Sequence, residues 1–127
     1  MENMTTTNYD HSALGLGNNE FETNVITIPA GASVVEGDML KRDAGTKKFV
    51  RVTDTSTETP VAVSTIAATN SGGAAADFPL RAIIGGKVPA GKIKVAGVAA
   101  NAAQLDMIRS YGIIPAVITD VSKTDNQ

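Results

Sequence analysis

The stretch from Val34 to Thr53, VVEGDMLKRDAGTKKFVRVT, has the pattern of two antiparallel strands and decides the fold. Its apolar residues fall on either side of the segment Asp43–Thr46 (DAGT). That segment predicts a turn, because an Asp side chain can accept hydrogen bonds from the following backbone and glycine tolerates positive φ. After the turn, residues 49–52 (FVRV) have the composition of a half-buried strand. We therefore expect a hairpin on which the rest of the chain is built.

Five further segments carry the short apolar or alternating patterns of β-strands. They are residues 25–28 (VITI), 61–66 (VAVSTI), 78–88 (FPLRAIIGGKV), 92–95 (KIKV) and 113–118 (IIPAVI). Turn signals separate them, including two copies of the tripeptide Pro-Ala-Gly. This spacing predicts a mainly β fold, a small antiparallel β barrel or sandwich, over residues 25–120.

The alternation within these strands also predicts the hydrophobic core. The expected core residues are Ile26, Ile28, Leu40, Val50, Val52, Val61, Val63, Leu80, Ala82, Ile84, Ile93, Val95, Leu105, Ile108 and Val117. The pair Gly85-Gly86 predicts a bend or bulge in its strand. Pro115 cannot donate a ladder hydrogen bond, so the last strand is expected at a sheet edge or at a bulge.

One short helix is expected near the C-terminus, over residues 101–111. Asn101 suits the N-cap, and Gln104 three residues later completes the capping-box pattern. Arg109 lies in the last turn, where a cation is favoured, and Gly112 suits the left-handed residue after a helix. Residues 121–127 are expected to form a frayed tail.

Residues 1–24 show no periodicity and are expected to form an extended N-terminal arm. The segment is rich in Asn and Thr, has four acidic residues and contains no Lys or Arg. Its isolated apolar side chains are Tyr9, Leu14, Leu16 and Phe21. Such a segment buries too little surface to offset its own ordering entropy. Two interpretations stay open: the arm lies on another protein, or it packs on its own barrel as an extra strand.

Composition excludes several classes of site. The 127 residues suit one domain, and the absence of Cys excludes disulfides and thiolate metal sites. His11 is the single histidine, so neither a metal site nor a cofactor is expected. The net charge of −2 argues against nucleic acid, and no apolar run approaches the length of a membrane span. The polar start of the sequence does not have the pattern of a secretory signal.

No catalytic signature is present either. The sequence has no Ser-His-Asp or Cys-His arrangement, and Asp38, beside Gly37, is expected to accept backbone hydrogen bonds within its own turn. We therefore expect a protein that is not an enzyme.

The predicted hairpin concentrates positive charge. It carries Lys41, Arg42, Lys47, Lys48 and Arg51 against the single Asp43 in its turn. One interpretation is an ordinary solvated hairpin tip. The other is an electropositive patch that contacts an acidic partner surface.

Four motifs in this order resemble the head decoration, or capsid cement, proteins of tailed bacteriophages. They are PAG followed by GDML (residues 29–40), the basic hairpin, TPVAVSTIA (residues 59–67) and LRAIIGGKV (residues 80–88). A late helix ending in Gly-Ile, here at Gly112 and Ile113, is also similar. The resemblance covers about residues 25–118, and its motifs are short.

The resemblance implies a virion protein, made in the bacterial host cytoplasm, that binds the outer surface of the capsid and stabilises it against the pressure of packaged DNA. It also implies a partner, the major capsid protein, and a homo-trimer at threefold or quasi-threefold positions that bridges neighbouring capsid subunits. It supplies no catalytic residues. No motif fixes the contact residues, so the hypothetical capsid contacts are Tyr9, His11, Leu14, Leu16, Phe21, Lys47 and Lys48.

A second class of function stays open, a small ligand-binding or swivelling carrier-type β domain. The pattern Gly-Asp-x-Leu at residues 37–40 also occurs in such domains. Against that class, the sequence has no Met-Lys-Met or Glu-Ala-Met-Lys acceptor turn.

Overall fold

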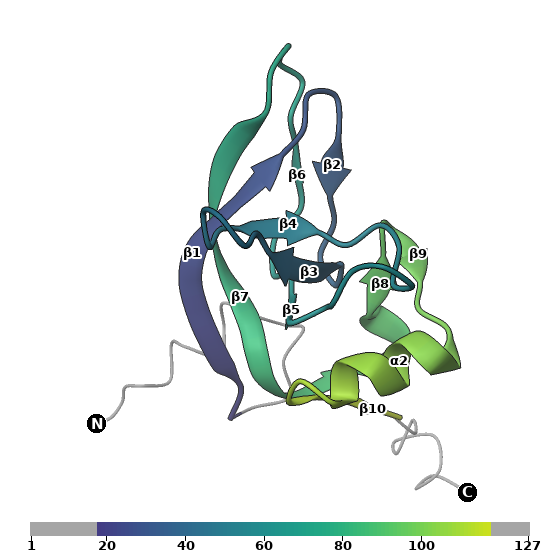
Figure 1. Ribbon diagram of the computed structural model, residues 1–127. Helices are drawn as coiled ribbons and strands as arrows, with labels where there is room; N and C mark the ends of the chain where they lie inside the picture. The colour runs from purple at the N-terminus through teal and green to yellow at the C-terminus, as the bar shows by residue number, and fades with distance from the viewer. Residues whose placement is uncertain (1–17, 118–127) are drawn as a thin grey trace, which may run out of the picture.

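The computed structural model describes residues 18–117, which form a small β-barrel with one α-helix packed at one end (Figure 1). The strands are β1 (Glu20–Ile28), β2 (Ser33–Val34), β3 (Met39–Arg42), β4 (Phe49–Arg51), β5 (Ala62–Val63), β6 (Ala68–Thr69), β7 (Ala76–Pro89), β8 (Lys94–Val95), β9 (Val98–Ala99) and β10 (Ile113–Ala116). A 3₁₀ turn, η1 (Ala90–Lys92), follows β7, and the helix is α2 (Ala102–Arg109). The mainly β class, the barrel and the helix near the C-terminus are as the sequence predicts.

Five strands close the barrel in the order β1-β4-β3-β5-β7, because β1 pairs with β7 as well as with β4. The expectation of a wholly antiparallel arrangement is wrong at one seam, where β1 and β4 run parallel at Ile26 and Phe49. An odd number of strands cannot alternate direction all the way round a closed barrel, so one neighbouring pair must be parallel. The edge strand β10 is also parallel, to β7, and the chain between the two makes the long connection that parallel pairing needs.

The boundary of the N-terminal arm needs correction. β1 begins at Glu20, so residues 20–24 belong to the barrel and pair with β7. These five positions extend the predicted strand at 25–28 toward the N-terminus and form neither an arm nor a separate extra strand. Phe21 is half-buried and packs against the core, because it lies opposite Ile83 in this ladder. The proposed contacts Tyr9, His11, Leu14 and Leu16, and the tail at 121–127, lie outside the described residues.

A β-bulge interrupts the β1–β7 ladder where the sequence places Gly85-Gly86. Glu20 pairs with Gly85 but Phe21 pairs with Ile83, which leaves Ile84 as the extra residue. The register change buries Ile83 completely and leaves Ile84 half-buried, so the prediction of Ile84 as a core residue is wrong.

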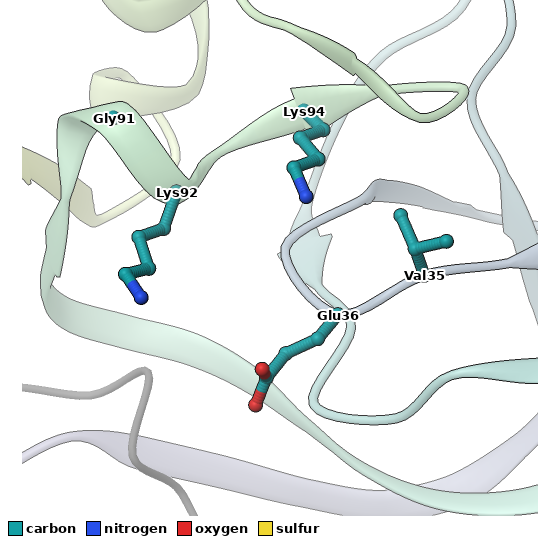
Figure 2. A pocket seen from close by; sticks show the side chains of 5 residues that line it. All are labelled: Val35, Glu36, Gly91, Lys92 and Lys94. Carbon is teal, nitrogen blue, oxygen red and sulfur yellow. The ribbon is translucent and has the colours of Figure 1, made fainter.

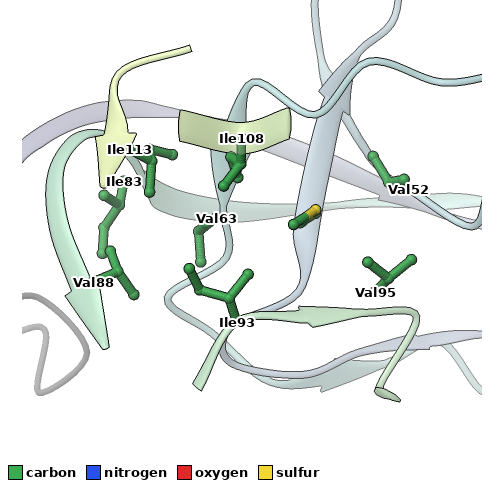
Figure 3. Packing of buried hydrophobic residues seen from close by; sticks show 9 residues of the cluster. Val52, Val63, Ile83, Val88, Ile93, Val95, Ile108 and Ile113 are labelled. Atoms are coloured by element: carbon green, nitrogen blue, oxygen red, sulfur yellow. The ribbon is translucent and has the colours of Figure 1, made fainter. Parts of the chain in front are cut away.

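The core has two clusters. The first, shown in Figure 3, fills the space between the barrel and α2 and consists of Met39, Val52, Val63, Ile83, Val88, Ile93, Val95, Ile108 and Ile113. Members of the second cluster are neighbours of the first along the same strands, as Leu40 is of Met39, so the second lies on the opposite face of those strands. It consists of Ile26, Ile28, Val34, Leu40, Phe49, Ala62, Leu80 and Ala82. Among the predicted core residues, Val50, Val61 and Leu105 are half-buried. Val117 is 89% exposed, because it lies one residue beyond the end of β10 at Ala116.

The turn at residues 36–38 crosses the chain that leaves η1. Gly37 has φ +97°, and a Cβ there would lie 1.9 Å from the carbonyl oxygen of Lys92. The backbone N–H of Lys94 donates to Gly37 O at 2.8 Å. Asp38 is fully buried, and its carboxylate accepts a hydrogen bond from the N–H of Val35, as expected of a turn residue.

The helix has the termini that the sequence predicts. The side chain of Asn101 accepts from the N–H of Gln104, and the Gln104 side chain accepts from the N–H of Asn101, both at 2.9 Å. Gly112 follows the helix with φ +95°. The helix buries Ile108 and leads directly into β10.

Candidate interaction surface

The β3–β4 hairpin presents its turn on a rigid frame. The Asp43 carboxylate accepts hydrogen bonds from the N–H of Gly45 at 3.1 Å and the N–H of Thr46 at 2.8 Å, which confirms the predicted turn. The hairpin is also tied to its surroundings by ion pairs. Arg42 binds both carboxylate oxygens of Glu22 at 2.8 and 2.7 Å, and its guanidinium lies 4.9 Å from the centre of the Phe49 ring.

Two lysines of the hairpin are likewise paired with acidic residues. Lys48 donates to Asp77 at 2.6 Å, and Lys41 forms an ion pair with Glu58. The Arg51 guanidinium donates to the backbone carbonyl of Ser33. Most of the positive charge of the hairpin is therefore satisfied within the chain, which favours a structured hairpin over an open electropositive patch.

The three carboxylates that pair with the hairpin, on Glu22, Glu58 and Asp77, all have lowered pKa values. The hydrogen bond from Arg42 lowers the pKa of Glu22, and that from Lys48 lowers the pKa of Asp77. Burial acts to raise the pKa of Glu58, but hydrogen bonds from Lys41 and two backbone N–H groups outweigh it and bring the pKa to about 2. These carboxylates are ionised at neutral pH, so the ion pairs are fully formed there.

Among the predicted contacts, the structure describes Phe21, Lys47 and Lys48. Phe21 lies in β1 with the guanidinium of Arg81 at 4.3 Å from its ring centre, so it belongs to the barrel rather than to an arm. Lys48 is bound to Asp77, while Lys47 is exposed and makes no salt bridge within residues 18–117. Lys47 has φ +64°, a left-handed conformation at the end of the turn. Lys47 is therefore the hairpin lysine whose charge is not paired among the described residues.

An apolar groove that the sequence analysis missed lies where β7 and β10 end. It has a volume of about 500 Å³ and is lined by Pro89, Ala90, Gly91, Lys92, Ala116 and Val117. Val117, on one wall, is 89% exposed. Two features of the sequence indicate this groove: the second Pro-Ala-Gly tripeptide and the apolar Val117 shortly after Pro115. The alternating pattern instead predicts Val117 as a core residue.

A second, more polar hollow lies on the other side of the η1 turn. It measures about 290 Å³ and is lined by Val35, Glu36, Gly91, Lys92 and Lys94. Figure 2 shows the charged side chains of Lys92, Lys94 and Glu36 around this hollow. Gly91 and Lys92 of η1 line both hollows, so the two lie next to each other at this turn.

Within residues 18–117, no three His, Cys, Asp or Glu side chains are grouped closely enough to hold a metal ion. No helix in the same part of the chain is both long and apolar enough to span a membrane. Compared with known proteins, the chain matches no family model, no curated protein and no solved structure.

Proposed function

We propose that this protein is a structural component of a tailed-phage head, which binds the outer surface of the capsid and bridges neighbouring major capsid subunits. The observation that carries the proposal is that the motifs resembling head decoration proteins form the frame of one barrel. The first motif supplies the Pro29–Gly31 turn and the Gly37-Asp38 turn. The motifs at 59–67 and 80–88 supply β5 and the central part of β7.

The hairpin gives this barrel a rigid contact element. Its ion pairs to Glu22, Glu58 and Asp77 fix it on both sides, so its exposed turn can meet a partner without a large loss of side-chain entropy. Lys47 lies on that turn, makes no salt bridge within residues 18–117, and suits an acidic position on the shell.

The N-terminal residues before the barrel supply a second contact element in this proposal. Tyr9 and His11 are the side chains there that combine an apolar body with a hydrogen-bonding group, a type favoured at interfaces. Ordering such a segment costs about 1–2 kcal/mol per residue for the backbone. Binding should therefore depend on many copies and on several contacts per copy, which fits a trimer at threefold or quasi-threefold positions.

A second candidate function, a swivelling carrier-type domain, is favoured by one observation. Lys47 is exposed at the end of a tight hairpin turn, the kind of place where a carrier displays a modified lysine. The intact mass of the protein purified from its native source distinguishes the two, because a carrier gains the mass of its attached group.

Co-sedimentation with phage heads tests the proposal. Heads of the phage that encodes the chain, prepared without this protein, should carry the added protein into the pellet until their sites are filled. A variant lacking residues 2–12 and the variant Lys47→Glu should each bind more weakly, whereas Lys87→Glu, at an exposed lysine on β7, should bind as the unchanged protein does. Failure of the unchanged protein to bind heads at any concentration would overturn the proposal.

A further inference from the structure

The apolar groove at the end of β7 has no occupant within residues 18–117. Pro89, Ala90, Ala116 and Val117 supply its apolar walls, and Val117 is 89% exposed. Lys92 lies on its rim. An apolar hollow with a basic rim suits an apolar segment that also carries acidic residues.

The start of the barrel is directed toward this groove. β1 and β7 are antiparallel, with Ile28 opposite Ala76 and Glu20 opposite Gly85, so the chain read backward from Glu20 advances along β7 toward Pro89. Asn19 continues this course, because its side-chain amide donates to Gly85 O at 3.3 Å and to Lys87 O at 2.9 Å. β7 itself extends to Pro89, beyond the last residue that β1 pairs with.

The distances match the sequence before Asn18. Lys87 to Pro89 spans two residues of strand, about 7 Å, and the three residues from Asn19 back to Leu16 can span about 10 Å. Residues 13–17 read ALGLG, so Leu14 and Leu16 lie on one face of an extended strand. Residues 1–17 also carry Glu2 and Asp10 and no Lys or Arg, which complements Lys92.

We propose that residues 13–17 continue β1 along the end of β7 and that Leu14 and Leu16 cover the groove of their own chain. The short connection gives the segment a high effective concentration at the groove, so a modest apolar contact suffices to hold it. The N-terminal region is then divided at about residue 13. Leu14 and Leu16 serve the barrel, and only residues 1–12, with Tyr9 and His11, remain for an external partner. This inference does not depend on the proposed function.

Engineered disulfides test the placement directly, since the chain contains no cysteine and an introduced pair has no competing thiol. The full-length double variant Leu16→Cys with Ala90→Cys is oxidised at low protein concentration. A disulfide requires Cα atoms about 4.4–6.8 Å apart, so it forms efficiently only when residue 16 lies in the groove. We expect a cross-link within one chain, seen as faster migration on a non-reducing gel and as the loss of both free thiols.

Two matched pairs accompany this experiment. Leu16→Cys with Val98→Cys pairs the same N-terminal position with a 68% exposed valine on β9, outside the groove, and should remain unlinked. Val121→Cys with Ala90→Cys asks whether the C-terminal residues occupy the groove instead.

Each other outcome overturns the inference in a specific way. Cross-linking only of the pair at 121 and 90 would assign the groove to the C-terminal segment. Covalent dimers from the pair at 16 and 90, without monomer cross-links, would assign it to a second copy. If residue 16 forms disulfides with residues 90 and 98 equally well, or with neither, then it has no preferred place on the barrel.

Discussion

The carboxylate of Asp38 accepts a hydrogen bond from the backbone N–H of Gly97 at 2.8 Å, joining two turns that are 59 residues apart. Its other oxygen accepts from the N–H of Val35 at 2.9 Å. Asp38 is fully buried, so these bonds replace the water that the carboxylate loses on folding. One side chain thereby connects the β2–β3 turn to the β8–β9 hairpin.

Replacing Asp38 by Asn should therefore destabilise the protein. Asn has a single acceptor oxygen, so one of the two N–H groups would face an amide donor in a buried site. The free energy of unfolding should fall by about 1–3 kcal/mol, measured by urea titration. Asp106→Asn is the control, because that side chain is 78% exposed on α2 and its loss should change the value by less than about 0.5 kcal/mol. Equal effects of the two substitutions would contradict this role for Asp38.

Gly37 and Gly31 offer a second matched pair. Both have positive φ, but a Cβ at Gly37 meets the Lys92 carbonyl oxygen at 1.9 Å, whereas a Cβ at Gly31 meets nothing within 4 Å. Gly31→Ala should cost about 1–2 kcal/mol, the strain of a left-handed alanine. Gly37→Ala should lower the free energy of unfolding by clearly more, because the turn at residue 37 and the backbone at Lys92 must move apart. A smaller loss of melting temperature at Gly37 than at Gly31 would be inconsistent with this crossing.

The same substitution at two valines tests the corrected core. Val52 is fully buried and Val117 is 89% exposed. Val52→Asp should prevent folding, because it buries a charge without a partner, while Val117→Asp should remain soluble and folded. Circular dichroism and gel filtration of both variants check the expectation. A folded Val52→Asp protein, or an unfolded Val117→Asp protein, would show that the packing is wrong.

Glu58 should make stability depend on pH in the acidic range. Its pKa is lowered from 4.5 to about 2 in the folded protein, so its ionised form is favoured by folding. The resulting stability is present above the unfolded-state pKa and is lost as the pH falls through the folded-state pKa. At most about 3 kcal/mol is involved.

The check is the free energy of unfolding as a function of pH, for the unchanged protein and for Glu58→Gln. The variant should be less stable at neutral pH, and the difference should shrink as the pH falls from 4.5 toward 2. A difference that stays constant over this range would mean that ionisation of Glu58 does not contribute.

The local elements were predictable from sequence because their signals lie within a few residues. The Asp43 turn and the Asn101–Gln104 capping box have hydrogen bonds that the side chains themselves specify. Asp38 was also assigned correctly to its own turn, but its bond to Gly97 depends on how distant segments meet, which no local pattern reveals.

The errors have a common origin in long-range pairing. The parallel seam between β1 and β4 follows from the number of strands in the closed barrel, and the exchange of Ile84 for Ile83 in the core follows from a bulge. The predicted arm includes residues 20–24 because they are mostly polar. In the structure these residues form a strand, because they pair with β7. The alternating pattern predicts Val117 as a core residue. Because β10 ends at Ala116, Val117 lies outside the strand and is exposed.

In the proposed function, the barrel binds the outside of a phage head. Its most direct test is an electron cryomicroscopy reconstruction of heads from the encoding phage, prepared without the protein and then saturated with it. We expect added density on the outer surface at threefold or quasi-threefold positions, into which three copies of the barrel fit. Heads whose outer surface is identical with and without the protein would contradict the claim, and isolated single copies would contradict the trimer.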